Sequence, residues 1–460
     1  AREVAATGID WNFAPCLAIP QDERWGRYYE GYSENTELVA NLGVATIKGY
    51  QNKLGKGHSI AACAKHFIGD GATIWGTGDN NYQIDRGNAI IDTDILYSKY
   101  LIPYQKAIDN GVLTVMASFN SYNGLKCHAS SYLFNDLLKK DLGFEGFVIS
   151  DWRGIDEIPG DYKSDIITSV NAGMDMIMVP GDTIWGGEPY HKFLRLFKES
   201  VKEGSISEER INDAVKRILK VKYELGLFDN PYTNKKYIND FGSKKHREVA
   251  REAVRKSIVL LKNDNNILPL SDKTGNIHVA GLGANDIGMQ CGGWTMEWQG
   301  KLGNITSGTT ILEGIKLSAS KKSNVTYSEN GTGAKNIDVG IVVVGEKPYA
   351  EGLGDDGELK LSDEDIQTID NMKKYNVPIV VIMISGRPLI ITEEINEWDA
   401  FVAAWLPGTE GNGVSDIIFG DYSPTGKLSF TWPRNIAQIP IDSNNSKSDA
   451  LFDYNYGLSY

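Results

Sequence analysis

Gly146-Phe147-Val148-Ile149-Ser150-Asp151-Trp152 is the stretch of sequence that decides the fold of the first half of the chain. Its apolar centre is a continuous run without polar alternation, which is typical of a parallel strand buried on both faces. The run ends in a carboxylate beside an indole. Because functional side chains of parallel α/β folds lie where strands end and loops begin, the stretch also predicts a functional role for Asp151.

Similar apolar runs lie on both sides of this stretch. The predicted strands, in chain order, are 11–19, 60–68, 112–119, 147–151 and 174–179. Segments with helical periodicity alternate with or follow them, at 35–54, 92–109, 130–142, 164–172, 190–203 and 208–225, the last with Ser207 as its cap. This repetition of strand and helix predicts a (β/α)8-type barrel or a doubly wound sheet.

The number of strands and the start of the chain both bear on the barrel. A closed barrel has eight strands in about 250 residues, and five are predicted here. The chain begins with Ala1-Arg2-Glu3-Val4-Ala5-Ala6, a pattern typical of a helix already under way, and not with Met. We therefore expect a barrel truncated at its N-terminus, and any targeting signal would belong to the missing part.

The second half of the chain predicts a separate α/β domain. Residues 227–243 indicate a linker, because they contain Pro and Asn, lack periodicity and follow a helix. An amphipathic helix is expected over 246–262. The further predicted strands are 277–282, 325–328, 339–344, 379–384 and 401–406, with helices near 311–319 and 363–374. The expected domains are thus a barrel over 1–226, the linker, and a doubly wound α/β sandwich over 244–460.

Composition excludes several classes of protein. The 460 residues exceed one ordinary hydrophobic core. With 47 basic and 60 acidic residues, the net charge is −13, so the protein as a whole does not attract the negatively charged phosphates of a nucleic acid. No window of about 18 uninterrupted apolar residues predicts a membrane span. The cysteines lie far apart without metal-ligand spacing, which favours free thiols and no metal site: Cys16, Cys63, Cys127 and Cys291.

Polar residues at the predicted strand ends are the first candidates for chemistry. Lys65 and His66 end the second strand, but alternation sends neighbouring side chains to opposite faces unless the strand bends there. Asp151 could serve as a tuned carboxylate, or it could cap the next turn or pair with Lys65 or Arg27. A lone His66 could equally be a hydrogen-bonded core residue.

Two loops of the second half are further candidates. Residues 345–355 follow the strongest predicted strand and are rich in Gly, Pro and acidic side chains, which favours a functional loop. Residues 290–300 place Trp294 and Trp298 in a glycine-rich loop. Gly281-Leu282-Gly283 has the start of a dinucleotide turn, but Asp286 occupies the place of the third glycine, so no cofactor is expected.

Taken together, the motifs of this chain resemble those of the glycoside hydrolases of family three. The similarity is greatest to plant and bacterial exo-acting β-glucan hydrolases and β-glucosidases, and it runs in order from residue 1 to 460. The motifs that carry it are Phe13-Ala14-Pro15-Cys16, Arg24-Trp25-Gly26-Arg27, Tyr32-Ser33-Glu34, Lys65-His66-Phe67, Gly146 to Trp152, Gly173-Met174-Asp175-Met176, Arg251-Glu252-Ala253, Cys291 to Gly300, Ser385-Gly386-Arg387-Pro388 and Tyr456-Gly457-Leu458-Ser459-Tyr460. The resemblance implies a barrel, then an α/β sandwich, with an active site at their junction.

The resemblance also implies roles for individual residues. Asp151 matches the nucleophile, and Glu351 matches the acid/base, with Glu346 and Glu358 as nearby competitors. The residues that match sugar-binding positions are Arg27, Lys65, His66, Asp79, Met116, Trp152 and Trp298. The two tryptophans match a pair of indoles that sandwich the second sugar, and Met116 matches an apolar wall.

Three positions depart from the pattern of close relatives. Asp79 stands where they carry Glu, which weakens its assignment as a sugar ligand. Phe119 occupies a position often held by Tyr, so a hydroxyl near the nucleophile would be absent. Glu157 stands where a plant relative has a basic residue, which puts the outer subsite in doubt.

The activity implied is that of a retaining exo-acting β-glucosidase or β-glucan exohydrolase. It would release terminal glucose by double displacement, with no metal or organic cofactor. The expected partners are β-linked glucosides, oligosaccharides and glucans, and the family implies a periplasmic or secreted enzyme. The alternatives are a sugar-binding remnant with a decayed site, or a relative acting on N-acetylhexosaminides or β-xylosides.

Overall fold

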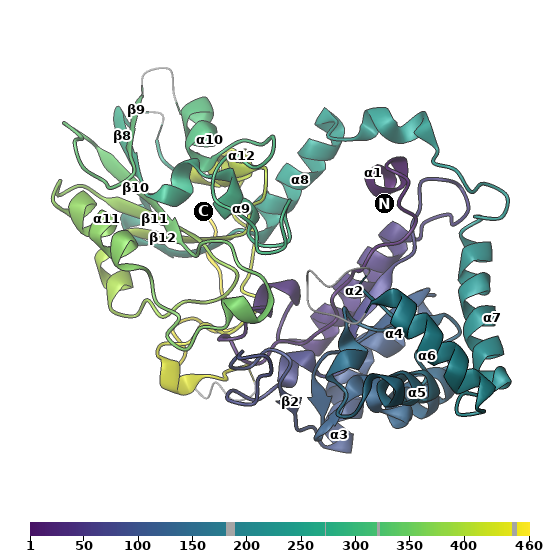
Figure 1. Ribbon diagram of the computed structural model, residues 1–460. Helices are drawn as coiled ribbons and strands as arrows, with labels where there is room; N and C mark the ends of the chain where they lie inside the picture. Colours follow the sequence, from purple (N-terminus) through teal and green to yellow (C-terminus); the bar gives the residue numbers. More distant parts are fainter. Residues whose placement is uncertain (181–188, 272, 320–322, 444–448) are drawn as a thin grey trace. The chain divides into compact units, whose positions relative to one another are not determined.

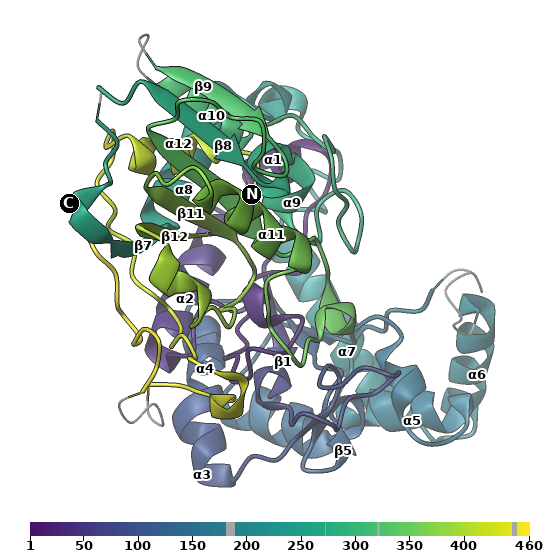
Figure 2. The ribbon, with the colours of Figure 1, turned by 90° about the vertical axis from the view of Figure 1, so that its left-hand side faces the viewer.

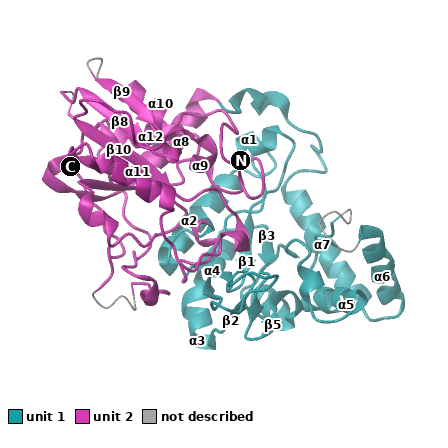
Figure 3. Cartoon of the chain, turned by 60° about the vertical axis from the view of Figure 1, so that its left-hand side comes forward, with its two compact units in different colours: residues 1–20, 30–242 teal, residues 21–29, 243–460 magenta. Residues whose placement is uncertain are grey.

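The computed structural model describes residues 1–180, 189–271, 273–319, 323–443 and 449–460 (Figure 1). The chain divides into two compact units, drawn in different colours in Figure 3. Unit 1 comprises residues 1–20 and 30–242, and unit 2 comprises residues 21–29 and 243–460. Residues 21–29 lie within the range expected for the first domain, yet they belong to the second unit.

Unit 1 is built on a parallel sheet whose strands follow the order of the chain. Its ladder is β1 (Cys63–Phe67), β3 (Thr114–Ala117) and β6 (Phe147–Ile149). Isolated parallel bridges extend the sheet at both edges. Trp11 and Cys16 pair with Ala61 and Lys65 next to β1, and Met176 pairs with Ile149 of β6. All five predicted strand segments are therefore neighbours in the expected order. The first forms bridges rather than a full ladder in part because Pro15 has no N–H to donate.

Side chains on the two faces of this sheet pack into different cores. Along β3, Val115 and Ala117 lie in a core with residues of helices, whereas Met116 lies in a second cluster with Phe147, Ile149 and Val221, the last from the helix Glu208–Glu224. The α-helices are α1 (Arg2–Ala6), α2 (Thr36–Tyr50), α3 (Thr93–Ile95), α4 (Ile102–Asp109), α5 (Tyr162–Ala172), α6 (Tyr190–Lys202) and α7 (Glu208–Glu224), with π-helices at Leu96–Tyr100 and Tyr132–Asp141. The Ser207 hydroxyl caps α7 as predicted, accepting the Arg210 N–H.

Unit 1 also contains smaller elements. The short strands β2 (Asn88–Ala89), β4 (Ser121–Tyr122) and β5 (Leu125–Lys126) form a sheet of their own. Within the stretch expected as a linker, Lys235–Asp240 form a 3-10 helix that packs near α1.

Unit 2 contains a six-stranded sheet in the order β7-β12-β11-β10-β8-β9. The strands are β7 (Val259–Asn263), β8 (Asn276–Ala280), β9 (Asn324–Ser328), β10 (Val339–Gly345), β11 (Ile379–Ile384) and β12 (Ala400–Trp405). The five predicted strands are the parallel ones. The prediction of one helix over 246–262 was wrong at its end, because α8 (Lys244–Ser257) stops and the apolar run from Ile258 to Leu261 enters the sheet as antiparallel β7.

The sheet of unit 2 is covered on both faces, as expected for a doubly wound domain. On β11, Val380 and Ile382 pack with α10 (Ile311–Ser318) and α12 (Gly411–Ile418), whereas Val381 and Met383 pack with α11 (Asp363–Lys373). Figure 1 shows α11 on one side of the sheet and α10 and α12 on the other, and Figure 2 gives a second view.

Strand order locates a place for ligands in unit 2. The connection from β8 leads to β9 at one edge, and the chain then returns across β8 to β10, so the order reverses between β8 and β10. In open α/β sheets, ligands bind beyond the carboxyl ends of the strands at such a reversal. The loops that follow β8 and β10 carry Trp298 and Glu351, respectively. Among the described residues, none of the helices is both long and apolar enough to span a membrane.

Candidate active site

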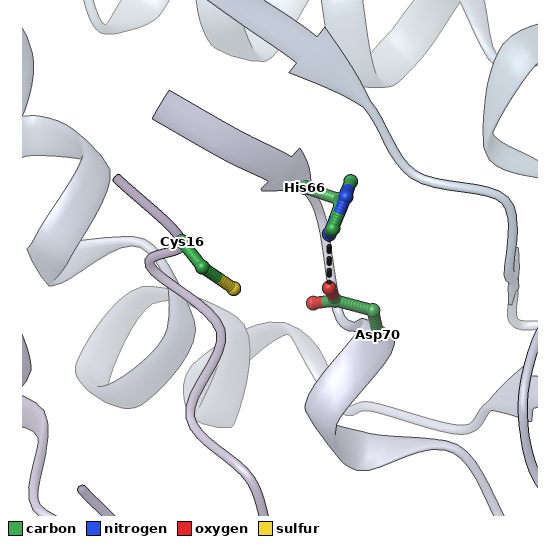
Figure 4. A group of neighbouring side chains, drawn as sticks. All are labelled: Cys16, His66 and Asp70. Carbon is green, nitrogen blue, oxygen red and sulfur yellow. Dashed lines mark hydrogen bonds and ion pairs between the residues drawn. The ribbon is translucent and has the colours of Figure 1, made fainter. Parts of the chain in front are cut away.

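In unit 1, the ends of β1 and β6 bring an imidazole between two carboxylates. His66 Nδ1 lies 2.7 Å from Asp70 Oδ2, and His66 Nε2 lies 3.6 Å from Asp151 Oδ2. All three side chains are buried. The pair of Asp70 with His66 is drawn in Figure 4. A carboxylate hydrogen-bonded to one ring nitrogen fixes the orientation of the ring, so the other nitrogen is aimed at Asp151.

The strand that carries His66 is irregular at this point. The pairing of β1 with β3 shifts register between Ala64 and Phe67, so the strand is irregular where Lys65 and His66 lie. His66 then faces Asp151, and Lys65 Nζ lies 3.9 Å from Glu30 Oε2. The structure therefore brings His66 to the candidate nucleophile and places Lys65 beside a different carboxylate.

The backbone and side chain of Asp151 are held on several sides. Its carboxylate accepts the Trp152 N–H at 2.6 Å, so the interpretation of Asp151 as a local cap holds for one oxygen. Its carbonyl accepts the Ser150 hydroxyl at 2.9 Å, and its own N–H donates to His128 Nε2 at 3.0 Å. Sequence reasoning missed His128 and Asp70. Asp70 lies three residues beyond the end of β1, in a 3-10 turn, and His128 follows no strand of the main sheet, so neither was among the polar residues at the predicted strand ends.

Cys16, His66 and Asp70 are the described residues that come closest to a metal-binding cluster. Their donor atoms lie within 4.8 Å of one another, and Figure 4 shows the Cys16 sulfur beside the hydrogen-bonded pair. Burial, reinforced by Asp70, raises the pKa of the Cys16 thiol to about 12. A metal ion would have to displace that proton and the proton shared by His66 and Asp70, so the cluster fits a neutral thiol beside a hydrogen-bonded pair.

Two further candidates lie in different surroundings in unit 1. Met116 is 3% exposed and packs with Phe147 and Ile149, which agrees with an apolar wall. Trp152, directly after Asp151, is 47% exposed. A large apolar ring that stays this exposed next to a buried carboxylate is available for stacking against a ligand.

Asp79 is tied into a network of charges. Its carboxylate accepts a hydrogen bond from Lys126 Nζ at 2.9 Å, and this bond lowers the pKa of Asp79. Lys126 lies at the same distance from Glu157, which Arg86 also contacts at 2.8 Å. The Arg86 guanidinium in turn lies 3.9 Å from the centre of the Phe119 ring. The departures Asp79, Phe119 and Glu157 therefore belong to one connected group.

In unit 2, Glu351 begins a 3-10 turn, Glu351–Gly354, on the loop after β10. The residue is 8% exposed, its φ is +54°, and Oε1 lies 3.8 Å from Arg27 Nη1. Arg27 comes from residues 21–29, and its neighbour Gly26 approaches the turn so closely that a Cβ there would lie 2.0 Å from the Glu351 carbonyl oxygen. The structure thus places Arg27 with Glu351.

The surroundings of the other two glutamates differ from those of Glu351. Arg387 holds Glu346 at 2.9 Å, and Glu346 also accepts the Gly386 N–H at 3.0 Å and the Tyr349 hydroxyl at 2.9 Å. These bonds use both carboxylate oxygens and give Glu346 a structural role. Glu358 has a side chain that is 74% exposed and pairs with Lys360. Of the three, only Glu351 is a buried carboxylate beside a residue that matches a sugar ligand.

The loop after α9 (Ile287–Cys291) presents the second indole. Trp298 is 41% exposed, and its carbonyl accepts the Trp294 N–H at 3.0 Å. Gly293 lies so close to the Tyr349 carbonyl that a Cβ would come within 2.1 Å of its oxygen. The loop is therefore packed against the one that carries Glu351, while its indoles remain accessible.

Comparison with known proteins identifies both halves of the chain. Residues 1–221 match the glycosyl hydrolase family 3 N terminal domain, and residues 258–460 match the glycosyl hydrolase family 3 C-terminal domain. A solved exo-1,3/1,4-beta-glucanase from a Pseudoalteromonas species superposes with a TM-score of 0.92 at 42% identity, covering 100% of this chain and 75% of that one.

Curated relatives align over the whole chain. A lysosomal beta glucosidase of Dictyostelium discoideum is 31% identical, a periplasmic beta-glucosidase of Salmonella typhimurium 30%, and a beta-xylosidase of Formosa agariphila 31%. Each alignment covers 100% of this chain, which spans 59%, 66% and 68% of the length of these relatives, respectively. On the match of both domain models and on these alignments, the chain belongs to glycosyl hydrolase family 3.

Proposed function

We propose that this chain carries the catalytic residues of a retaining exo-acting β-glucosidase or β-glucan exohydrolase. The observation that carries the proposal is the setting of Asp151, a buried carboxylate at the end of β6 with one oxygen 3.6 Å from His66 Nε2. The beta glucosidases and the exo-1,3/1,4-beta-glucanase among its relatives favour glucose as the released sugar.

In the first step, Asp151 attacks the anomeric carbon of the terminal sugar. The bond from that carbon to the leaving oxygen breaks, and Glu351 donates its proton to this oxygen. An ester between the sugar and Asp151 results. The neutral, protonated form of Glu351 is thereby consumed, and it becomes a carboxylate.

In the second step, the Glu351 carboxylate takes a proton from water. The water oxygen attacks the anomeric carbon, the ester bond breaks, and Asp151 leaves as a carboxylate. Two displacements on the same carbon return the β configuration, so the product retains the anomeric form of the substrate.

The remaining site residues supply binding. Lys65, His66 and Arg27 are nitrogen donors suited to sugar hydroxyls. The exposed indoles of Trp152 and Trp298 are suited to stacking on the faces of a second sugar. The ion pair of Asp79 with Lys126 would have to be shared or broken for Asp79 to bind a hydroxyl, so its role as a sugar ligand is the weakest in the set.

The natural substrates proposed are β-linked glucosides, oligosaccharides or glucans. A periplasmic or secreted location is proposed from the periplasmic relative. The second candidate substrate is a β-xyloside, because one relative is named a beta-xylosidase.

The test is a release assay with three aryl glycosides, the β-glucoside, the β-xyloside and the N-acetyl-β-glucosaminide, with the first-formed anomer identified by NMR. We expect fastest release from the glucoside and a β-configured product. Asp151→Asn should abolish release, whereas Asp161→Asn, the same change at an exposed helix cap where Asn caps equally well, should preserve it. An α-configured product, or an Asp151→Asn variant with normal turnover, would contradict the mechanism. No release from any of the three would contradict the assignment as an enzyme.

A further inference from the structure

His128 is a fully buried imidazole whose hydrogen bond, among the described residues, is to the backbone of Asp151. It lies in the 3-10 turn Cys127–Ala129, its exposed fraction is 0%, and its Nε2 accepts the Asp151 N–H at 3.0 Å. Because Nε2 accepts, the ring proton must sit on Nδ1. That Nδ1 makes no hydrogen bond with the described residues. A buried donor without a hydrogen bond costs free energy. The ring therefore keeps the tautomer that accepts the Asp151 N–H although this tautomer leaves its Nδ1–H unsatisfied.

The His128 imidazole accepts the backbone N–H of Asp151 at the point where the β-ladder ends. The preceding residue, Ser150, donates its N–H to the Met176 carbonyl in the parallel neighbour. The Asp151 N–H is next along the strand, and His128 accepts it in place of a carbonyl. The chain then turns, and the Gly154 N–H closes this turn on the Asp151 carbonyl at 3.0 Å. His128 therefore defines where the strand stops and the turn bearing the carboxylate begins.

Gly154 makes room for the ring. A Cβ at this position would lie 2.3 Å from both Cε1 and Nε2 of His128. The backbone of Gly154 is not in the left-handed region, so space, and not conformation, requires the glycine here. Any side chain at residue 154 would push the imidazole away from the Asp151 N–H.

Burial, together with the nearby charge of Lys126, lowers the pKa of His128 to about 3. The ring thus stays neutral from about pH 5 to pH 8, and its acceptor is available throughout the range in which a glycosidase works. A protonated imidazole would lose that acceptor and place a cation against the Asp151 N–H. The contact is therefore insensitive to pH within this range.

We infer that His128 is a positioning residue for the Asp151 carboxylate, an inference that rests on the proposed function of Asp151 as nucleophile. With its N–H held by His128, its carbonyl by Ser150 and Gly154, and Oδ1 by the Trp152 N–H, Asp151 has little freedom except at Oδ2. That oxygen faces His66. Loss of the His128 contact would let the reacting oxygen drift, and a misplacement of about 1 Å can lower a rate on the order of 100-fold.

Two variants of nearly equal shape separate the acceptor from the packing. Gln at residue 128 can place an amide oxygen near the position of Nε2, whereas Met fills the same space without a strong acceptor. We expect His128→Met to lower kcat on the aryl β-glucoside by about 100-fold with little change in KM, and His128→Gln to recover to within about tenfold of the wild type. The ratio of each variant to the wild type should stay constant between pH 5 and pH 8.

Two controls complete the experiment. His278 is also buried, but its ring nitrogens bond to Thr326 and Ser328 in unit 2. His278→Met should lower the melting temperature and leave kcat unchanged. Gly154→Ala, which retains His128 in the sequence but displaces its ring, should reproduce the loss in kcat, and in a His128→Ala background it should cause little further loss.

The outcomes are distinct. An active wild type with equal kcat for His128→Met and His128→Gln, or a loss that His278→Met shares, would overturn the positioning role and leave the proposed function intact. A loss that varies with pH would overturn it in favour of proton transfer by His128. A wild type inactive on all three aryl glycosides would overturn both this inference and the proposed function.

Discussion

The two proposed catalytic carboxylates sit in contrasting surroundings. The backbone of Asp151 is held by hydrogen bonds, and its carboxylate faces the His66 imidazole. Glu351 lies at the start of a short turn, 3.8 Å from the Arg27 guanidinium. A nucleophile benefits from a fixed position, and an acid/base must exchange a proton with both the leaving group and water. These surroundings suit the division of roles that we propose.

The role of Glu351 predicts a dependence on the leaving group. Glu351→Ala should lower turnover of an alkyl β-glucoside far more than that of a dinitrophenyl β-glucoside, because only the poor leaving group needs a proton. Azide should restore turnover of the variant and yield a β-glucosyl azide, detected by mass spectrometry and NMR. The matched change at exposed Glu358 should have little effect, and Glu346→Ala should lower the melting temperature without azide rescue. Equal losses on both substrates and no azide adduct would remove Glu351 from this role.

Gly26 predicts a loss of activity from a change that alters no charge. A methyl group at residue 26 would collide with the Glu351 carbonyl at 2.0 Å and with the backbone of Gly354 at 2.8 Å. We expect Gly26→Ala to displace the Glu351 turn and to lower both kcat and the melting temperature. Gly49 in α2 has nothing within 4 Å of an added Cβ, so Gly49→Ala should keep full activity and gain up to about 1 kcal/mol in stability. Equal behaviour of the two variants would contradict the close packing at Gly26.

At this scale, the sequence alone could predict candidate site residues only where a local pattern marks them. Asp151 follows an apolar run, so its place at a strand end could be deduced. Asp70 and His128 could not, because each reaches the site through a turn whose path depends on tertiary packing. The preference for Glu351 over Glu346 rests in the structure on the bond between Glu346 and Arg387, residues on different loops that no local pattern connects.

At the scale of elements, strands that are apolar throughout were the most predictable. All five parallel strands of unit 2 were found within a few residues of their expected bounds. β7 was missed because its apolar residues continue the amphipathic pattern of α8. The segment is a strand because it pairs with β12 at the edge of the sheet, and this tertiary contact leaves no mark in the local sequence. α12 was missed because Gly411 and Gly413 oppose helix formation. A Cβ at Gly411 would lie 2.5 Å from the Ile311 nitrogen, so close helix packing explains that glycine.

Helix α11 carries a buried acid that predicts a pH-dependent stability. Burial raises the pKa of Asp365 to about 6, from an ordinary value of 3.8. The folded state therefore binds the proton more tightly than the unfolded state does. Proton binding stabilises the folded state fully below pH 3.8, and this contribution to the free energy of unfolding is lost as the pH rises towards 6. Asp365→Asn should stabilise the protein at pH 7.5, on the order of 2 kcal/mol, and the gain should shrink towards zero near pH 4.

Thermal melting at the two pH values checks this expectation. Asp363→Asn makes the same change at an exposed position in the same helical turn and should shift the melting temperature little at either pH. A destabilised Asp365→Asn protein at pH 7.5 would show that the hydrogen bond from the Gly345 N–H to Asp365 outweighs the cost of burying the charge.

At the scale of the whole molecule, the second unit is made of two pieces of chain. Residues 21–29 supply carbonyls of Glu23 and Arg24 that accept hydrogen bonds from Arg387, and the Gly26 N–H donates to Asp355 at 3.0 Å. Arg387 is 2% exposed, so without these acceptors its buried guanidinium would lose hydrogen-bond partners. The family models match residues 1–221 and 258–460 as two domains, and neither boundary reveals this exchange.

The exchange predicts that residues 243–460 made alone fold weakly. Addition of a synthetic peptide covering residues 18–32 should raise the melting temperature of that fragment in a concentration-dependent way. A peptide with Gly26→Ala should bind more weakly, because of the collision with residues 351 and 354. A fragment that melts cooperatively at the temperature of the full chain, unaffected by peptide, would show that residues 21–29 add nothing to unit 2.

Residues 21–29 also affect the order in which unit 2 can fold during biosynthesis. Trp25 and Tyr28 are 2% and 1% exposed in the finished protein, where Tyr28 lies against Phe430 with ring centres 4.5 Å apart. A ribosome releases these aromatic side chains before it has made Phe430 or any strand of the sheet of unit 2. Until Phe430 has been made, Tyr28 lacks this ring contact, and a neighbouring nascent chain could bind the aromatic segment instead. Residues 21–29 therefore have to be kept apart from other chains until residues 243–460, with which they form one unit, have emerged.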